Sequence, residues 1–176
     1  MGKRRHLQLL AERLKRVDAM IIVGIDPGLA ITGYGILEKT GSKVAYKAHG
    51  VMRTGKELPL PVRMLSLANQ LGELLDLWKP GVMVTEKLFF SSNVNTAMMV
   101  GGSIGVILLC AAQRNIEWFE YRPAEVKMAV AGYGAAEKKQ VQYMISRLLN
   151  LSENPRPDDA ADALAIALCH AHTHKF

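Results

Sequence analysis

Four acidic residues stand where secondary structure would bring their carboxylates together. Asp26 and Glu86 each end a run of apolar, mostly β-branched residues, which is typical of a buried central strand. Asp159 and Asp162 lie three residues apart at the start of a helical pattern, so their side chains share one helix face. Four converging carboxylates repel one another, and burial makes each one costly unless it is paired or bound to metal. We therefore expect divalent cations to join them.

Such a cluster is suited to the hydrolysis of phosphodiester bonds. Two cations about 3.5–4 Å apart can activate water, neutralise the phosphoryl group and stabilise the leaving oxygen, and carboxylate ligands suit Mg²⁺ or Mn²⁺. Asp26 is the candidate to bridge both ions, and Glu86 and Asp162 are each expected to complete one ion's shell. The alternatives are structural: Asp26 as a cap of the following turn, Glu86 as a surface acid, and Asp162 as an acid favoured by the helix dipole.

The neighbouring acids Asp158 and Asp159 compete for one role. Asp158 follows Pro157 and precedes the apolar periodicity, so we predict that it caps the helix and that Asp159 belongs to the cluster. Asp158 is also four residues from Asp162 and stays an alternative ligand.

The elements that must position these residues follow two patterns. The first three strands, joined by short glycine-containing turns, predict an antiparallel meander at residues 20–25, 32–39 and 44–53. A helix then opens at Pro61, with a stripe of Leu65, Ala68, Leu71, Leu75 and Trp78. After it, strands alternate with helices, which favours parallel pairing. The expected elements are strands at 82–86 and 116–121 and helices at 95–114, 123–130, 136–150 and 159–172.

Six motifs occur in a specific order along the chain. They are GIDPG at 24–28, TGYG at 32–35, TEKLFF at 85–90, AEVK at 124–127, AAEKKQVQ at 135–142 and DDAADALAIA at 158–167. From about residue 20 to residue 172 the chain resembles the RuvC family of Holliday-junction resolvases, a branch of the RNase H-like nucleases. The resemblance implies an α/β, RNase H-like fold, with a five-stranded mixed sheet of three antiparallel strands then two parallel ones, and helices on both faces.

The same resemblance implies an endonuclease that resolves four-way DNA junctions by paired symmetric nicks. It implies a homodimer, two Mg²⁺ ions per active site with Mn²⁺ as a substitute, and a branch-migration helicase complex as partner. The apolar helix at 95–114 would supply the dimer interface or belong to the core.

Several residues match positions that this family uses. Asp159 matches a catalytic position, and Lys127 and Lys138 match basic positions near the scissile phosphate, with Lys139 as a substitute for Lys138. Phe89 matches a position that stacks on an unpaired base at the junction centre. The alternatives are lysines on solvated helix ends and a core role for Phe89 or Phe90.

Composition sets the outer limits. The 176 residues suit one domain, and the net charge of +6 favours a polyanionic partner. Residues 1–19 carry six bases against two acids and leucines at helical spacing, and lie outside the resemblance. We therefore expect a basic N-terminal extension, 1–19, and a nuclease domain, 20–176. Residues 4–17 could form an amphipathic helix that contacts DNA or the dimer partner. The alternatives are a poorly ordered extension or a misassigned start, with Met20 as the natural beginning.

The remaining chemistry-bearing residues have ordinary explanations. Cys110 and Cys169 have no CxxC partner and are expected to be buried thiols of a reducing compartment. His170, His172 and His174 are expected to form a solvated helix end, although His170 and His174 have the spacing of helical zinc ligands. No apolar stretch reaches the roughly 20 residues of a membrane span, and no secretory signal is evident, so a cytoplasmic protein without a membrane partner is expected.

Three other functions compete. The Asp-containing first turn is shared by nucleotide-dependent phosphotransferases of the actin and sugar-kinase kind, but those need two lobes and a second such turn. A non-catalytic junction-binding protein would not need the complete acidic set. A nuclease acting on structured RNA keeps the chemistry and changes the substrate.

Overall fold

The structure, a computed structural model, describes residues 19–87 and 94–174, and side chains in 94–97 are left undescribed. Within these ranges a five-stranded sheet has the order β3-β2-β1-β4-β5. The strands are β1 (Met20–Asp26), β2 (Ile31–Thr40), β3 (Lys43–Arg53), β4 (Val82–Glu86) and β5 (Glu117–Tyr121). The first three are antiparallel, and β4 and β5 continue the sheet in parallel with β1. The expected mixed sheet is confirmed.

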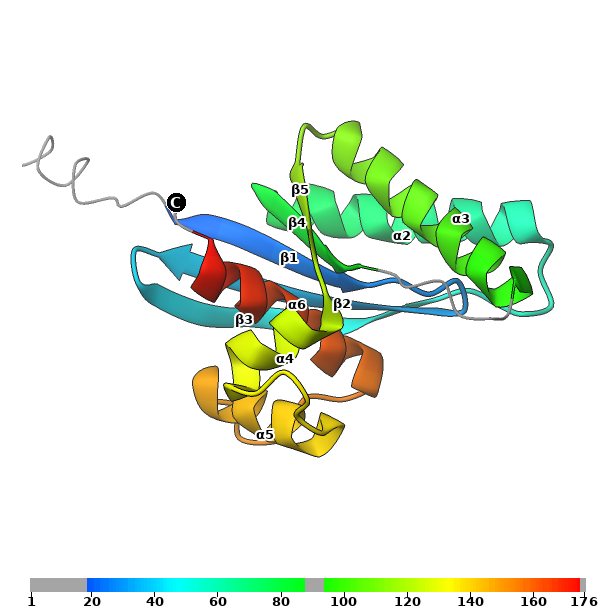
Figure 1. The fold of residues 1–176 in the computed structure, drawn as a ribbon. Helices are drawn as coiled ribbons and strands as arrows, with labels where there is room; N and C mark the ends of the chain where they lie inside the picture. The colour runs from blue at the N-terminus through cyan, green and yellow to red at the C-terminus, as the bar shows by residue number, and fades with distance from the viewer. Residues whose placement is uncertain (1–18, 88–93, 175–176) are drawn as a thin grey trace, which may run out of the picture.

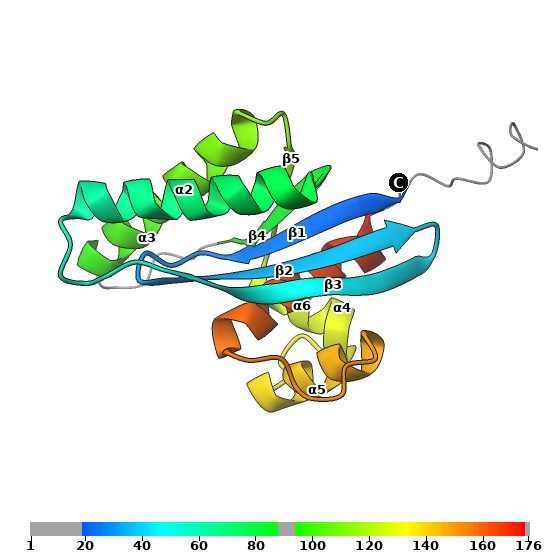
Figure 2. The same cartoon turned by 180° about the vertical axis from the view of Figure 1, so that it is seen from behind.

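Helices cover both faces of the sheet (Figure 1). One face carries α2 (Leu60–Trp78) and α3 (Val94–Ala112), and the other carries α4 (Pro123–Ala131), α5 (Lys138–Leu148) and α6 (Asp158–Thr173). The view from behind shows α2 running along the sheet on one side and α4, α5 and α6 on the other (Figure 2). None of the helices in the described ranges is long and apolar enough to cross a membrane.

The core divides into two clusters because side chains alternate along each strand. Val23 and Ile25 on β1 face Leu71 and Leu75 on α2. The predicted α2 stripe is right for these two leucines but wrong for Leu65, which is 61% exposed. The buried stripe continues through Leu67 instead, since Leu67, Leu71 and Leu75 follow one another at intervals of four residues on one helix face. The helix begins at Leu60, one residue earlier than expected.

The second cluster is built around α6, which lies directly on the sheet. Its residues from Ala160 to Ala171 are all buried except Asp162. The alanines make the helix narrow, and two glycines opposite it leave room for its backbone. A Cβ on Gly24 would lie 2.1 Å from the Ala163 carbonyl oxygen, and one on Gly35 would lie 2.8 Å from the backbone of Leu164. The helix therefore contacts the strands backbone to backbone.

The end of α6 corrects one expectation and confirms another. His170 is fully buried, stacks on His174 with ring centroids 4.7 Å apart, and hydrogen-bonds through Nδ1 with the Tyr121 hydroxyl at 2.9 Å. The predicted solvated ending is thus wrong for His170, because β5 packs against this turn, and right for the exposed His172. Cys110 and Cys169 are buried free thiols, as predicted.

Candidate active site

Two neighbouring strands present Asp26 and Glu86 to the same side of the sheet. The parallel register pairs Ile25 with Thr85, so the next residues, Asp26 and Glu86, lie side by side at the strand ends. Alternation along β1 turns Asp26 to the side of Gly24, the side on which α6 lies. The loop after each strand begins here, so these carboxylates stand at the rim of the core and not inside it.

The first two turns of α6 bring Asp159 and Asp162 to the same place. Burial raises the pKa of Asp26 to about 7, and the carboxylates of Asp162, Asp159 and Glu86 act in the same direction. Burial and the charge of Asp162 also raise the pKa of Glu86, against the opposing charge of Lys127. The structure thus gathers the four predicted acids into one strongly negative cluster.

Asp158 points away from this cluster and does not cap the helix. The helix begins at Asp158 itself, with Pro157 as the N-cap residue, so the capping prediction is wrong by one position. The Asp158 carboxylate instead accepts hydrogen bonds from Gln142 at 3.0 Å and lies 3.2 Å from Lys138 Nζ, and these contacts lower its pKa. Of the two neighbouring acids, Asp159 is the one whose charge acts on Asp26.

Lys138, the first residue of α5, contacts both Asp158 and Asp162 of α6. Its Nζ donates to Asp162 Oδ2 at 3.0 Å and lies beside Asp158. Burial lowers the pKa of Lys138, but the hydrogen bonds and charges of these two carboxylates outweigh it and raise the pKa overall. The ammonium is therefore firmly charged and neutralises part of the cluster.

A cavity of about 350 Å³ opens beside the acids. It is lined by residues of β4 and of the helices α4, α5 and α6, which are Glu86, Pro123, Val126, Lys127, Lys138, Val141, Asp162 and Ala165. The two predicted lysines and two of the predicted acids thus face one space. This arrangement can receive a phosphate, with cationic groups and carboxylates on its walls.

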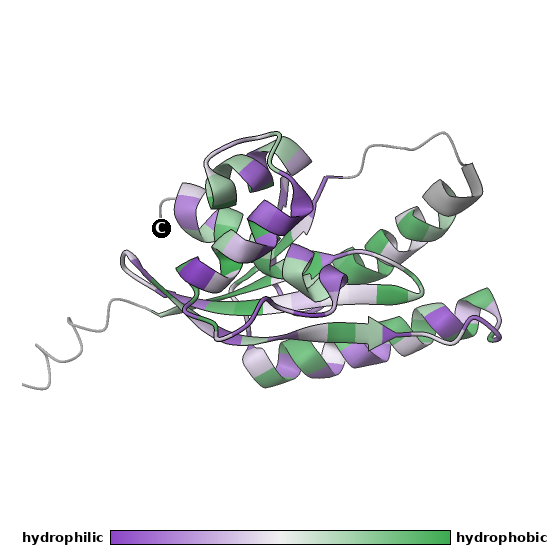
Figure 3. Cartoon of the chain, turned by 90° about the horizontal axis from the view of Figure 1, so that it is seen from below, coloured by the Kyte–Doolittle hydropathy of each residue, from purple (hydrophilic) through white to green (hydrophobic). Residues whose placement is uncertain are grey.

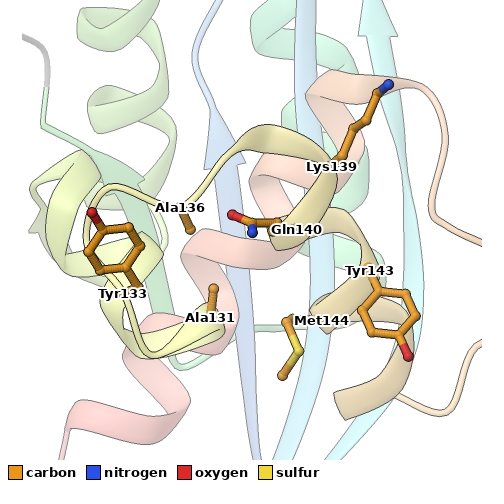
Figure 4. A pocket seen from close by; sticks show the side chains of 7 residues that line it. All are labelled: Ala131, Tyr133, Ala136, Lys139, Gln140, Tyr143 and Met144. Atoms are coloured by element: carbon orange, nitrogen blue, oxygen red, sulfur yellow. The ribbon is translucent and has the colours of Figure 1, made fainter.

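A second hollow, of about 420 Å³, adjoins the next residue of α5, because Lys139 lines it while Lys138 lines the first cavity. Its walls are Ala131, Tyr133, Ala136, Lys139, Gln140, Tyr143 and Met144. Figure 4 shows Tyr133 and Tyr143 at opposite ends of this hollow, with Lys139 extending away from both. None of these lining residues carries a carboxylate, so the hollow is separate from the acidic cluster.

The four acids fit divalent metal ions held in an open site. In the ranges that the structure describes, no three carboxylate, imidazole or thiol groups converge closely enough to enclose an ion by themselves. Mg²⁺ rarely needs that, since it is commonly held by one or two carboxylates together with phosphate oxygens and water. Burial, and after it the charges of Asp162, Asp159 and Glu86, raise the pKa of Asp26 more than the charge of Lys138 lowers it, and hard oxygen donors are present.

Two predicted aromatic residues and the N-terminal extension lie outside the described ranges, and one residue near the site was not predicted. Phe89, Phe90 and residues 1–18 lie outside the described residues. Gln142, which holds Asp158, carried no sequence signal except its place one turn after Lys138 on the same helix face.

Comparison with known proteins places this geometry in a family. Residues 22–170 match the family described as crossover junction endodeoxyribonuclease RuvC. A protein of that name from Pseudothermotoga lettingae is 52% identical over 151 residues, covering 86% of this chain and 93% of the relative. One from Alkaliphilus oremlandii is 47% identical over 157 residues, covering 89% and 96%.

Solved structures agree with the sequence matches. Thermus thermophilus RuvC in complex with a Holliday junction substrate is 35% identical, with a TM-score of 0.82 and coverage of 87% of this chain and 93% of that one. The yeast mitochondrial Holliday junction resolvase Ydc2 has a TM-score of 0.62 at 18% identity, which supports a common fold alone.

Proposed function

Since this chain belongs to the RuvC family and has its RNase H-like fold, we propose how its acidic cluster performs the family's reaction, the cutting of crossover DNA junctions. The chain is a structure-specific endodeoxyribonuclease that resolves four-way junctions. The observation that carries the assignment to this cluster is the pKa of Asp26, raised to about 7 by burial and by three further carboxylates. Such an arrangement is unfavourable in isolation and becomes favourable when divalent cations bind.

We assign the metal-binding role to Asp26, Glu86, Asp159 and Asp162. Bound divalent ions, in our proposal two Mg²⁺ per site with Mn²⁺ as a substitute, supply an activated water and neutralise the phosphoryl group. The charges of the other three acids all act on Asp26, so Asp26 is the residue proposed to contribute to both metal sites. Glu86 holds its carboxylate from the sheet, and Asp159 and Asp162 hold theirs from the helix, so strand and helix together fix the ligand spacing.

We assign the phosphate-binding role to Lys138 and Lys127. Both line the cavity with Glu86 and Asp162, and each ammonium can donate to a phosphoryl oxygen. Asp158 and Gln142 keep Lys138 over the cavity, and its high pKa keeps it charged. Lys139 is one residue further along α5, where it can bind the flanking DNA backbone. Phe89 is proposed to stack on an unpaired base, from a segment outside the described residues.

A homodimer is proposed to form through the outer face of α3. Met98 and Leu109 on this helix are 72% and 58% exposed, and Gly101 and Gly105 between them have open space where a side chain would stand. In the hydropathy view α3 is mostly green and pale (Figure 3). Apolar exposed stripes of this kind mark interfaces. A two-fold dimer then places two identical sites on equivalent strands of a nearly two-fold junction, which produces paired symmetric nicks.

The wider assignments follow from the substrate. We propose that the nuclease domain spans residues 20–176 and that residues 1–19 are an extension it does not need. A branch-migration helicase complex is the proposed partner on the junction. The cytoplasm, where DNA is accessible and free thiols such as Cys110 and Cys169 persist, is the proposed location.

The test compares a labelled mobile four-way junction, a matched duplex and an RNA stem-loop, each with Mg²⁺, Mn²⁺ or EDTA. Metal-dependent paired nicks at symmetric positions of the junction alone are expected. Asp159→Asn should abolish cutting while junction binding persists, whereas the adjacent Asp158→Asn, which only loosens Lys138, should lower the cutting rate by less. Binding without cutting under every metal would indicate a non-catalytic junction protein, and cutting of the RNA alone an RNase.

A further inference from the structure

Gly33 on β2 lies against the first turn of α6, beside the acidic cluster. A Cβ built on Gly33 would stand 2.0 Å from the Asp159 carbonyl oxygen and 2.4 Å from its carbonyl carbon. Real Cβ atoms essentially never approach a neighbour closer than 3.0 Å, and here the neighbour is backbone, which cannot rotate away. Any side chain at residue 33 would therefore displace the first turn of α6.

Conformation does not explain a glycine at this position. Gly33 lies inside β2. In the described residues only Gly41 and Gly132 are glycines with a positive φ, so Gly33 does not need the left-handed conformation that glycine allows. An extended residue of any type would fit the backbone of β2 at this point. The requirement is one of space above the strand.

Gly33 is also the cross-strand partner of Asp26. The antiparallel register of β1 and β2 pairs these two residues, so their Cβ directions point to the same face of the sheet. Asp26 thus projects its carboxylate from one strand, and the missing side chain on the next strand admits the helix turn that carries Asp159. The cross-strand pair of Asp26 and Gly33 therefore sets both the position of the Asp26 carboxylate and the distance of the Asp159 turn from the sheet.

We propose that Gly33 is a positioning residue that fixes the spacing between the Asp159 and Asp26 carboxylates. The inference rests on the proposed function of those acids as metal ligands. Its absent side chain lets α6 approach β2 about 1 Å further than an alanine would allow, since the 2.0 Å separation would have to reach at least 3.0 Å. Ligand geometry in a metal site is sensitive to displacements of that size, and about 100-fold in rate is lost for a misplacement of 1 Å.

Gly33→Ala is expected to lower the cleavage rate about 100-fold at saturating Mg²⁺ and to weaken Mn²⁺ binding, measured by electron paramagnetic resonance titration without DNA. Junction affinity in EDTA should stay within a few-fold of the parent. Ile36→Ala is the control, because Ile36 lies on the same strand, is fully buried, and faces the α2 side, away from α6. It should lower Tm while leaving Mn²⁺ affinity and the cleavage rate of the folded protein nearly unchanged.

A second variant separates positioning from general damage. Asp159→Glu lengthens the side chain by one carbon–carbon bond, about 1.5 Å, and should lose at least tenfold in rate in the parent protein, where Gly33 holds the turn close. In the Gly33→Ala background the same change should restore part of the activity and Mn²⁺ affinity, because the longer side chain compensates for the retreat of the helix. Merely structural damage at residue 33 would not be repaired by a longer acid.

If the parent enzyme cuts junctions, any of three results would overturn the inference. The first is a Gly33→Ala protein with the parent's Mn²⁺ affinity and cleavage rate, and the second is an Ile36→Ala protein that loses as much of both. The third is near-parental activity of Asp159→Glu alone. The Asp159→Glu test remains valid even if Gly33→Ala does not fold, because it is made in the parent protein. A parent that does not cut any junction would instead remove the proposed function.

Discussion

At the residue scale, the ionised Asp26 carboxylate that metal binding needs is also the form that destabilises the metal-free fold. In the folded, metal-free protein its pKa is about 7, whereas an unfolded aspartate titrates near its ordinary value. Between these two values the folded state holds a proton that the unfolded state has released. The free energy of unfolding therefore falls as pH rises through this window and stays low above it.

Asp26→Asn removes that conflict along with the activity. We expect the metal-free variant to be more stable than the parent at pH 8, by on the order of 2–4 kcal/mol, and the difference to vanish near pH 4. Thermal unfolding in EDTA at both pH values measures it. Mg²⁺ should then raise the Tm of the parent more than that of the variant; an Asp26→Asn protein less stable than the parent at pH 8 would make Asp26 a structural residue.

His170 provides a second titration, of opposite sign and far from the cluster. Burial lowers its pKa to about 4, with smaller contributions from the charges of His174 and Lys39. Between about 6.5 and 4 the unfolded state binds a proton that the folded state excludes, so this residue's contribution to stability is complete above pH 6.5 and is lost as pH falls.

Replacing His170 tests that assignment by a difference of stability curves. His170→Gln is expected to reduce the pH dependence of the free energy of unfolding by up to about 1.4 kcal/mol per pH unit between pH 6.5 and 4, whatever its overall stability. Denaturant unfolding at a series of pH values provides the curves. The exposed His172→Gln is the control, and an unchanged slope in His170→Gln would show that folding does not lower the pKa of His170.

The sequence was a good guide to which residues carry chemistry and a poor guide to their immediate neighbours. Asp26 and Glu86 could be located because a charge after an apolar strand is unusual. Asp158 was misassigned because the helix starts one residue earlier than its apolar periodicity suggests, and its true partners on α5 depend on how α5 packs against α6. The burial of His170 likewise depends on β5, which no local pattern reveals.

At the scale of elements, α5 places two adjacent lysines in two different spaces. Lys138 faces the cavity with Asp162, and Lys139 faces the hollow with the tyrosines. The consecutive residues differ in direction because a helix turns by 100° per residue. They should therefore fail in different ways when they are replaced.

Lys138→Met is expected to reduce the cutting rate about 10²-fold or more at saturating enzyme, the range seen when a positioned charge donor is lost. Lys139→Met should keep that rate and reduce the slope of log affinity against log salt by about 1, as for one lost phosphate contact. Single-turnover cleavage and binding at several salt concentrations separate the two effects. Equal rate losses in both variants would contradict the distinct roles.

Element types and order were predictable because long periodic segments dominate this chain. Each expected strand and helix is present, and the boundaries differ by one or two residues. The limits of α5 are an example: it begins after Glu137, whose backbone N–H donates to Gln140, and not at Ala136. What the sequence could not supply is the depth at which α6 lies on the sheet, which depends on the contact of small residues across two elements.

At the scale of the whole molecule, the exposed stripe of α3 carries the proposed dimer. Leu109→Glu, which places a charge in this stripe, should convert a dimer into monomers in light scattering coupled to size exclusion. Met128→Glu, at an exposed position of α4 on the opposite side of the sheet, is the control and should leave the mass unchanged. A Leu109→Glu protein that keeps the parent's mass would place the interface elsewhere.

Removing residues 1–19 tests the extent of the nuclease domain. The shortened chain, beginning at Met20, should cut junctions at a rate within about twofold of the parent, because every residue of the acidic cluster and both cavities lies downstream. Junction cleavage at physiological salt is the measurement. A severe loss of resolution would give the basic segment a part in DNA binding or assembly.

The two helical layers have a further consequence, since the sheet separates the α3 stripe from the acidic cluster. A substitution that abolishes pairing of subunits changes one helical layer, whereas the described residues proposed to bind metal and phosphate lie at strand ends and in the other helical layer. Subunit number and bond cleavage are thus separable properties of this chain. A monomeric variant should be a nicking enzyme that cuts one of the two equivalent strands and leaves the other continuous, a product that ligase can restore to the unresolved state.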